Sequence, residues 1–183
     1  MKTTMPLDFK KSKDVAFKKI ASGEDIGLFI LIALETGLRL NDILTLQKSN
    51  FFKRNSEYYI TLTAKKTGKK SVRPVSKITF DNVMDKPHER IFLNVKTNKI
   101  YSAMWVGREL KKAFLSDCKQ AKIENKTISA HSLRKSAGQR IYNYNGLEAA
   151  RDFLQHESYQ TTRDYLQVSQ REMNSNIINT LIN

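Results

Sequence analysis

The feature that most constrains the fold is an apolar run from Ile26 to Leu34. The run is apolar on all sides, so it predicts a helix at the centre of the core rather than on the surface. It has about half of the roughly 20 residues that a membrane helix needs, and the N-terminus lacks the charged-then-apolar pattern of a signal peptide. The chain has 183 residues, which is the size of one domain. We therefore expect a soluble, cytoplasmic protein with one domain, 1–183, and no membrane partner.

Helical periodicity extends over most of the chain. A short helix is expected around Val15 to Ile20, and another follows Gly37 with Arg39 at its start. Further helices are expected over 101–121 as one long amphipathic helix, from Leu133 to a stop near Asn145-Gly146, and over 147–154, 159–167 and 171–181.

One segment between these helices has the residue types of a small sheet. Residues 58–63 are aromatic and β-branched, and a turn-like stretch separates them from a second run, Val72 to Val75. Pro74 lacks a backbone donor, so the second strand is expected at a sheet edge or strand end, and a third strand is expected around Phe51-Phe52. The sequence predicts an α+β fold, mainly α, in which a helical domain carries a small antiparallel β-sheet of about three strands near residues 50–76.

The chain is strongly basic, with 32 Lys and Arg residues against 18 Asp and Glu residues, a formal net charge of +14 and a pI near 9.9. Such an excess favours a polyanionic partner, and nucleic acid is the first expectation. A basic surface that only keeps the protein soluble is the alternative. The charge is concentrated in residues 53–80, where Glu57 is the single acidic residue and the basic residues are Lys53, Arg54, Lys65, Lys66, Lys69, Lys70, Arg73 and Lys77.

The sequence offers little to a metal ion. Cys118 is the single cysteine, and the three histidines, His88, His131 and His156, have no ligand-like spacing. An internal disulfide needs two cysteines, and a zinc site needs several spaced Cys or His ligands. We therefore expect no disulfide, no metal site and no cofactor.

His131 and Arg134 lie three residues apart at the start of an expected helix. Side chains at this spacing are neighbours on one helix face, and an imidazole beside a guanidinium suits a phosphate group. Such a pair is common on protein surfaces, so other motifs must support this interpretation.

Residues 154–165 contain a Leu-x-His step that ends at His156, then two threonines, and Tyr165 nine residues after the histidine. This segment resembles the C-terminal signature of the tyrosine recombinases, the phage integrase family. Three more motifs resemble those of the family in the expected order over about residues 10–170: an arginine box with Arg39 and Asp42, the hairpin lysine in Lys66-Thr67-Gly68, and the H-x-x-R box from His131 to Arg134. Gln155 departs from the pattern, because the family usually has glycine there and only glycine is free of Cβ constraints.

The resemblance implies a catalytic domain that breaks and rejoins DNA by transesterification, without metal or ATP. Tyr165 would attack the phosphodiester, form a 3′-phosphotyrosyl link and release a 5′ hydroxyl. A tyrosine with a pKa near 10 is mostly protonated at neutral pH, so this attack needs acid–base and cationic help. Arg39 and Arg134 would supply the cations, because a guanidinium matches the phosphate oxygens with a rigid fork of donors.

The other catalytic roles also follow from the resemblance. His131 assists proton transfer around Tyr165, and His156 hydrogen-bonds the phosphate. Lys66 is the general acid for the departing 5′ oxygen, with Lys65 as the next choice. Asp42 is expected to orient Arg39, and Tyr159 is the next candidate for the nucleophile.

The expected partner is double-stranded DNA that carries an attachment or recombination site, contacted by Lys65, Lys69, Lys70 and Arg73. The family implies a homotetramer on DNA, a monomer when free, and a bacterial, phage or mobile-element origin. The family's N-terminal core-binding domain has no counterpart that we recognise in residues 1–183. The apolar face of residues 170–183, formed by Met173, Ile177, Ile178 and Leu181, predicts a helix that docks on its own domain or on a neighbouring protomer.

Three functions stay open at this point. A site-specific recombinase or integrase is the leading interpretation. Relaxation of supercoils by a type IB topoisomerase route is an alternative, because rejoining the original strand uses the same chemistry. A non-catalytic DNA-binding domain is the third, because basic charge is sufficient for binding to phosphates.

Overall fold

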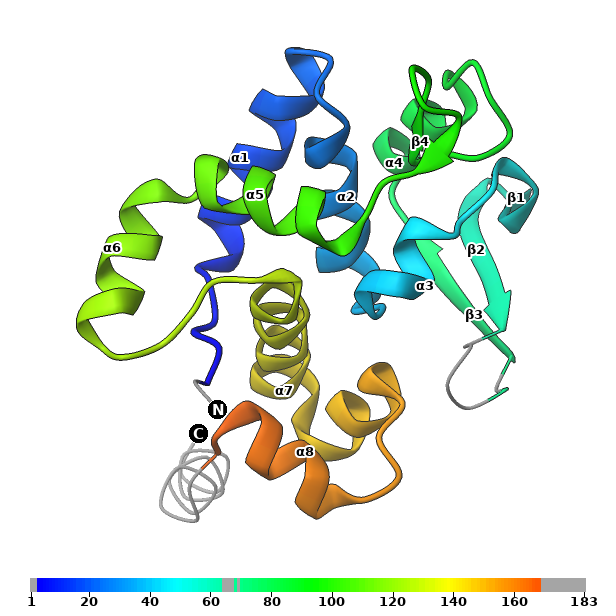
Figure 1. Cartoon of the computed structure of the whole chain (residues 1–183). Coiled ribbons are helices and arrows are strands. Elements are labelled where there is room, and N and C mark those ends of the chain that lie inside the picture. The colour runs from blue at the N-terminus through cyan, green and yellow to red at the C-terminus, as the bar shows by residue number, and fades with distance from the viewer. Residues whose placement is uncertain (1–2, 64–67, 69, 169–183) are drawn as a thin grey trace. The chain divides into compact units, whose positions relative to one another are not determined.

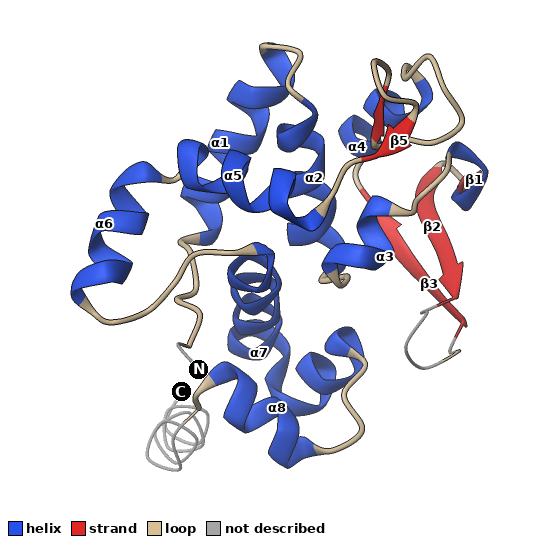
Figure 2. Cartoon of the chain, in the orientation of Figure 1, coloured by secondary structure: helices blue, strands red, loops and turns tan. Residues whose placement is uncertain are grey.

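The computed structural model describes residues 3–63, 68 and 70–168 of the chain (Figure 1). Helices dominate the described residues, and an antiparallel sheet of three strands accompanies them (Figure 2). The architecture confirms the predicted mainly α fold with a small sheet. The helices are α1 (Phe9–Ala21), α2 (Asp25–Thr36), α3 (Leu40–Leu44), the 3₁₀ helix η1 (Lys48–Asn50), α4 (Lys77–Met84), α5 (Ala103–Ala113), α6 (Leu115–Ile123), α7 (Ala130–Leu154) and α8 (Tyr159–Leu166); the strands are β1 (Phe51–Arg54), β2 (Glu57–Thr63), β3 (Lys70–Val75), β4 (Leu93–Asn94) and β5 (Lys99–Ile100).

The chain divides into two compact units, residues 1–137 and residues 138–183. Each unit has a buried apolar cluster of its own. That the two units act as one catalytic domain stays a prediction. Among the described residues, no helix has both the length and the apolar character needed to cross a bilayer.

Helix α2 is the core of the first unit, as its apolar run predicts. Every residue from Ile26 to Leu34 is buried, and the helix packs against α1, α4, α5 and β3. Gly27 allows the close approach of α1, because a Cβ there would lie 2.6 Å from the carbonyl oxygen of Ala16. A contact of that length is a steric clash, so only glycine fits this helix crossing.

The sheet has the order β1-β2-β3, with both strand pairs antiparallel. Ile60 lies opposite Phe51 on one side and opposite Arg73 on the other. Strand β3 is an edge strand, which confirms the position predicted from Pro74. Alternate residues of β3 are buried, among them Arg73 and Val75, because side chains along a strand point to opposite faces in turn.

Two parts of the first unit differ from the prediction. A single long helix over 101–121 is wrong, because the backbone leaves the helical region at Phe114 (φ −120°, ψ 46°) and separates α5 from α6. Phe114 is 1% exposed, so its ring enters the core at the point where a straight helix would have continued. Helix α4 and the ribbon β4-β5 were not predicted. Ser76 caps α4 by accepting a hydrogen bond from the Thr79 amide at 3.1 Å.

The second unit contains the C-terminal part of α7 and the helix α8. The predicted break near Gly146 is confirmed by its non-helical backbone (φ 82°, ψ −178°). The cluster of this unit consists of Tyr142, Ala150, Leu154, Leu166 and Val168. The helix predicted over 171–181 lies outside the described residues.

Candidate active site

The turn between α2 and α3 positions Arg39. Helix α2 ends at Gly37, which has the left-handed backbone (φ 60°) that favours glycine. The Gly37 amide donates to the Ala33 carbonyl at 2.9 Å. Arg39 follows with an extended backbone (φ −72°, ψ 151°) and a half-buried side chain. Its position confirms the prediction that Arg39 begins the third helix.

Two further arginines bind the backbone of this turn. The Arg73 guanidinium donates to the carbonyl of Thr36, and the Arg134 guanidinium donates to the carbonyl of Gly37. Both arginines are buried, with 7% and 4% of their surfaces exposed. The carbonyls at a helix C-terminus lack intrahelical partners and carry partial negative charge, so cationic donors satisfy them well. The first unit therefore brings Arg39 and Arg134 to one turn; their catalytic roles stay predictions.

His131 lies in the electric field of the same arginines. Desolvation of its ring, followed by the positive charges of Arg134 and Arg39, lowers the pKa of His131. The lowered pKa favours the neutral imidazole in the free protein. A neutral imidazole can accept a proton, which is the role that the family pattern implies for this residue.

We expect an NMR titration to give His131 a pKa below about 6.5, the value of an unperturbed histidine. In the unfolded chain the ring protonates first as the pH falls, so this residue reduces folding stability below that pH. Replacing Arg134 with methionine removes a nearby positive charge and should raise the pKa of His131. The His131→Gln variant identifies the resonance, and a pKa at or above the unperturbed value would contradict the prediction.

Asp42 is buried, with 7% of its surface exposed. Its negative charge raises the pKa of Arg73, against the larger opposing effects of burial and of the two other arginines. The negative charge of Asp42 thus acts on the cluster that Arg39, Arg73 and Arg134 form. That it orients Arg39 stays a prediction.

The predicted DNA-binding residues of the hairpin differ in their surroundings. Lys65, Lys66 and Lys69 lie outside the described residues, so their roles stay predictions. Lys70 is exposed and pairs with Thr63 across β2 and β3. Arg73 is buried instead of sharing an exposed basic surface, and a DNA contact by Arg73 stays a prediction. The alternation of side chains between the two faces of β3 could have predicted that Arg73 is buried, because Arg73 is two residues from the apolar Val75 and therefore shares its face.

The second unit brings His156 and Tyr165 together. Their rings meet edge to face with centroids 5.2 Å apart. Nδ1 of His156 lies 3.1 Å from the hydroxyl oxygen of Thr162, and this hydroxyl donates to the Ser158 carbonyl at 3.2 Å. Because the Thr162 hydroxyl donates its proton to the Ser158 carbonyl, it can only accept from His156. The arrangement therefore implies that Nδ1 of His156 is protonated and donates to Thr162. The second of the two threonines in the motif thus holds the ring of His156.

Gln155 adopts the conformation that the family's glycine would supply. Its backbone is left-handed (φ 52°), and its amide donates to the Asp152 carbonyl at 3.1 Å. The departure from the family pattern is therefore accommodated by backbone strain at Gln155. A side chain in this region costs roughly 1–2 kcal/mol per residue.

Replacing Gln155 with glycine should raise the free energy of unfolding by about 1 kcal/mol, since relief of strain outweighs the added freedom of the unfolded chain. Denaturant unfolding measures this change. Gln139→Gly is the matched control, because Gln139 lies inside α7 and glycine there should cost about 1 kcal/mol. A loss of stability in both variants would mean that Gln155 is not strained.

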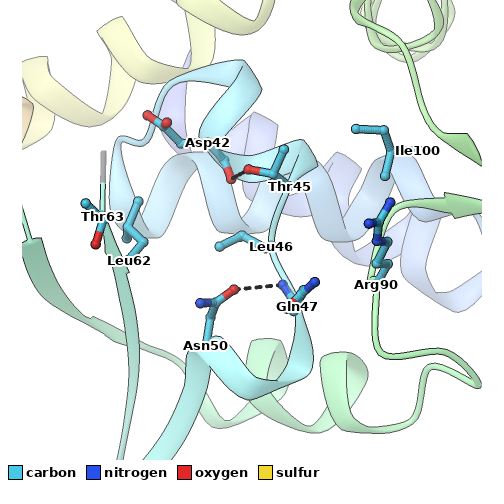
Figure 3. A pocket seen from close by; sticks show the side chains of 9 residues that line it. All are labelled: Asp42, Thr45, Leu46, Gln47, Asn50, Leu62, Thr63, Arg90 and Ile100. Carbon is cyan, nitrogen blue, oxygen red and sulfur yellow. Dashed lines mark hydrogen bonds between the residues drawn. The ribbon is translucent and has the colours of Figure 1, made fainter. Parts of the chain in front are cut away.

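A pocket of about 470 Å³ lies in the first unit, with Asp42 of α3 in its wall (Figure 3). Of the described site residues, Asp42 alone lines it. Its wall is mixed, with apolar Leu46, Leu62 and Ile100 and with polar groups such as Gln47 and Arg90. The Gln47 amide donates to the side-chain oxygen of Asn50 at 2.8 Å. Because Asp42 is the one described site residue in its wall, we place the candidate chemistry at the turn of residues 36–39 rather than in this pocket. Among the described residues, no cluster of three or more His, Cys, Asp or Glu side chains is placed to hold a metal ion.

Comparisons with known proteins agree with the motifs. The model of the phage integrase family matches residues 16–172, whereas no curated protein matches the chain significantly. Among solved structures, XerH site-specific recombinase bound to difH substrate in a pre-cleavage complex has a TM-score of 0.71 at 18% identity, over 97% of this chain and 54% of that chain. XerA recombinase has a TM-score of 0.68 at 16% identity, over 97% of this chain and 65% of that chain.

A lambda integrase dimer bound to a COC′ core site is a third similar structure, with a TM-score of 0.68 at 19% identity, over 91% of this chain and 48% of that chain. At these identities the similarity shows the fold. The chain spans about half the length of the XerH and lambda integrase chains that it matches.

Proposed function

The chain belongs to the phage integrase family, and on that premise we propose that it is a site-specific DNA recombinase or integrase. The observation that carries this proposal is that Arg134 binds the turn that bears Arg39, and that the charges of both arginines act on His131. Such a group of two guanidiniums and a neutral imidazole suits a phosphodiester in its transition state. The proposed substrate is double-stranded DNA; the similar XerH structure is bound to a difH substrate, and the lambda integrase dimer to a COC′ core site.

In the proposed reaction, the Tyr165 oxygen attacks the phosphorus, and its proton passes to His131. A bond forms between phosphorus and the tyrosine oxygen, and the bond between phosphorus and the 5′ oxygen breaks. Lys66 gives a proton to the departing oxygen, while Arg39 and Arg134 stabilise the additional negative charge on the phosphate. A 5′ hydroxyl of another strand then reverses the attack and completes recombination, without ATP.

The edge-to-face contact with His156 supports the assignment of Tyr165 as the nucleophile. The hydroxyl of Thr162 holds the His156 ring, so the ring can orient a phosphate near the tyrosine. We further propose that free monomers assemble into a tetramer on the recombination site. The tail at 170–183 would dock on its own domain or on a neighbouring protomer.

A covalent protein–DNA complex tests this function. DNA trapped on the protein in its host is sequenced to identify the site, and a nicked duplex of that sequence is incubated with the full chain. A covalent band on a denaturing gel is the expected result, because the nick lets the short fragment that carries the released 5′ hydroxyl leave and so prevents religation. DNA binding without a covalent band would select the non-catalytic alternative, and relaxation of any supercoiled plasmid without strand exchange would select the topoisomerase route.

We expect cleavage to survive an excess of chelator. In this mechanism arginines stabilise the negative charge of the phosphate, so no bound metal ion is needed as a Lewis acid. Single-turnover cleavage is measured with and without chelator, and then after magnesium is restored. Loss of cleavage in chelator, with recovery in magnesium, would contradict the metal-free mechanism.

A further inference from the structure

Arg73 occupies a position where packing alone would favour an apolar side chain. It lies on the inward face of β3 with Val75, and 7% of its surface is exposed. Its neighbour across the sheet, Ile60, is fully buried. A buried ion pair or cation is often replaceable by an apolar side chain without loss of stability, so its burial needs a reason beyond folding.

The segment from Arg73 to Thr79 is hydrogen-bonded to the end of α2. Besides the hydrogen bond from Arg73 to the Thr36 carbonyl, two groups farther along this segment bind the neighbouring carboxylate of Glu35. They are the amide of Ser76, at 3.1 Å, and the hydroxyl of Thr79, at 2.8 Å. The end of α2 would therefore keep two anchors to this segment without the guanidinium. Anchoring of the end of α2 therefore does not by itself explain why the side chain of Arg73 is charged.

The surroundings of Arg73 are electrically unfavourable for a cation. Burial, Arg134 and Arg39, in that order of effect, lower the pKa of Arg73 to about 10, and the opposing effect of Asp42 is smaller. Arg73 is still protonated at pH 7, so three guanidinium groups act on one another around residues 36–39. An anion at this cluster relieves the repulsion between them.

We propose that Arg73 is a third guanidinium of the phosphate site, a positioning residue that holds the turn bearing Arg39 and adds positive charge beside Arg39 and Arg134. This inference rests on the proposed function, in which the ligand of the cluster is a DNA phosphodiester. The motifs of the family resemblance account for Arg39 and Arg134. Arg73 would thus be an addition to the site in this chain.

The first test uses inorganic phosphate as the probe, so it does not depend on DNA cleavage. The melting temperature of the full chain is measured against phosphate concentration at constant ionic strength, because a ligand of the folded state raises it. We expect phosphate to stabilise the wild-type chain and to bind Arg73→Met about tenfold more weakly, because the variant removes one positive charge from the cluster. Arg73→Lys should recover part of the affinity, because it keeps the charge but loses the fork.

The second test measures covalent attachment to nicked DNA under single-turnover conditions. We expect Arg73→Met to lower the rate at saturating DNA by about 100-fold, as a misplaced catalytic group does, while the Kd for DNA rises by no more than about tenfold, since many other phosphate contacts contribute to it. Arg73→Lys should be intermediate. Thr79→Val is the matched structural control, because it removes a second anchor of the α2 end without removing a charge. It should lower the melting temperature but keep the wild-type rate and the wild-type phosphate response.

The outcomes separate this inference from the proposed function. A wild-type chain that never attaches to DNA, but whose phosphate response depends on Arg73, defeats the function and supports the third guanidinium. No phosphate response in the wild-type chain, or an unchanged response in Arg73→Met, overturns the inference. Equal losses in Thr79→Val and Arg73→Met also overturn it, because they would show that Arg73 is only a structural anchor.

Discussion

Replacing Tyr165 with phenylalanine is expected to abolish covalent attachment to DNA while leaving equilibrium binding nearly unchanged. The substitution removes the attacking oxygen and no charge, and DNA affinity depends chiefly on charge. Phenylalanine also keeps the ring that meets His156 edge to face, so the second unit should retain its packing. A denaturing gel measures attachment, and a binding titration at fixed salt measures affinity.

Tyr159→Phe is the matched control for this prediction. The ring of Tyr159 lies under the guanidinium of Arg151, 4.4 Å from the guanidinium carbon to the ring centroid, and phenylalanine keeps this contact. Attachment should therefore survive in Tyr159→Phe. If covalent complex persisted in Tyr165→Phe and disappeared in Tyr159→Phe, the nucleophile would be Tyr159.

Replacing Arg134 with methionine should lower the single-turnover rate of attachment by about 10²–10³-fold, the usual effect of removing one preorganised donor from a developing negative charge. The substitution also leaves the buried carbonyl of Gly37 without the donor it has now, which should reduce the free energy of unfolding by about 1–3 kcal/mol. Both effects are expected from one side chain because Arg134 binds the turn and is also proposed to stabilise the reacting phosphate.

Two further variants isolate the catalytic part of the Arg134 effect. Arg134→Lys keeps a positive charge without the planar fork and should recover only part of the rate. Arg108→Met removes an exposed arginine that pairs with Glu109 and should leave the rate unchanged. A wild-type rate in folded Arg134→Met at saturating DNA would show that Arg134 does not stabilise the reacting phosphate.

The local patterns of the sequence predicted most of the elements that hold the site. The apolar run of α2 can be stable only when buried on all sides, and Gly37 ends this helix in a backbone conformation that favours glycine. The position of Arg39 at the start of α3 follows from these two features. The hairpin was equally predictable, because alternating β-branched and aromatic residues with a nearby proline indicate an edge strand pair.

Other features depended on contacts that no short window contains. The break at Phe114 interrupts a helical pattern because the ring is buried in the core. Helix α4 has only 8 residues, too few for a clear helical period, and Glu35 holds its N-cap residue Ser76 and Thr79 in its first turn. Local propensity is a weak indicator wherever such tertiary contacts decide the backbone.

The helical fold, the small sheet and the order of the catalytic motifs could be read from residue patterns, because each depends on residues that are neighbours along the chain. The binding of Arg73 and Arg134 to successive carbonyls at the end of α2 could not, because it joins residues 37 and 97 positions apart in the sequence. Buried carbonyls at a helix end must find donors from elsewhere in the fold. That requirement gathers the cations, and their mutual repulsion favours the anion that we propose to bind at this turn.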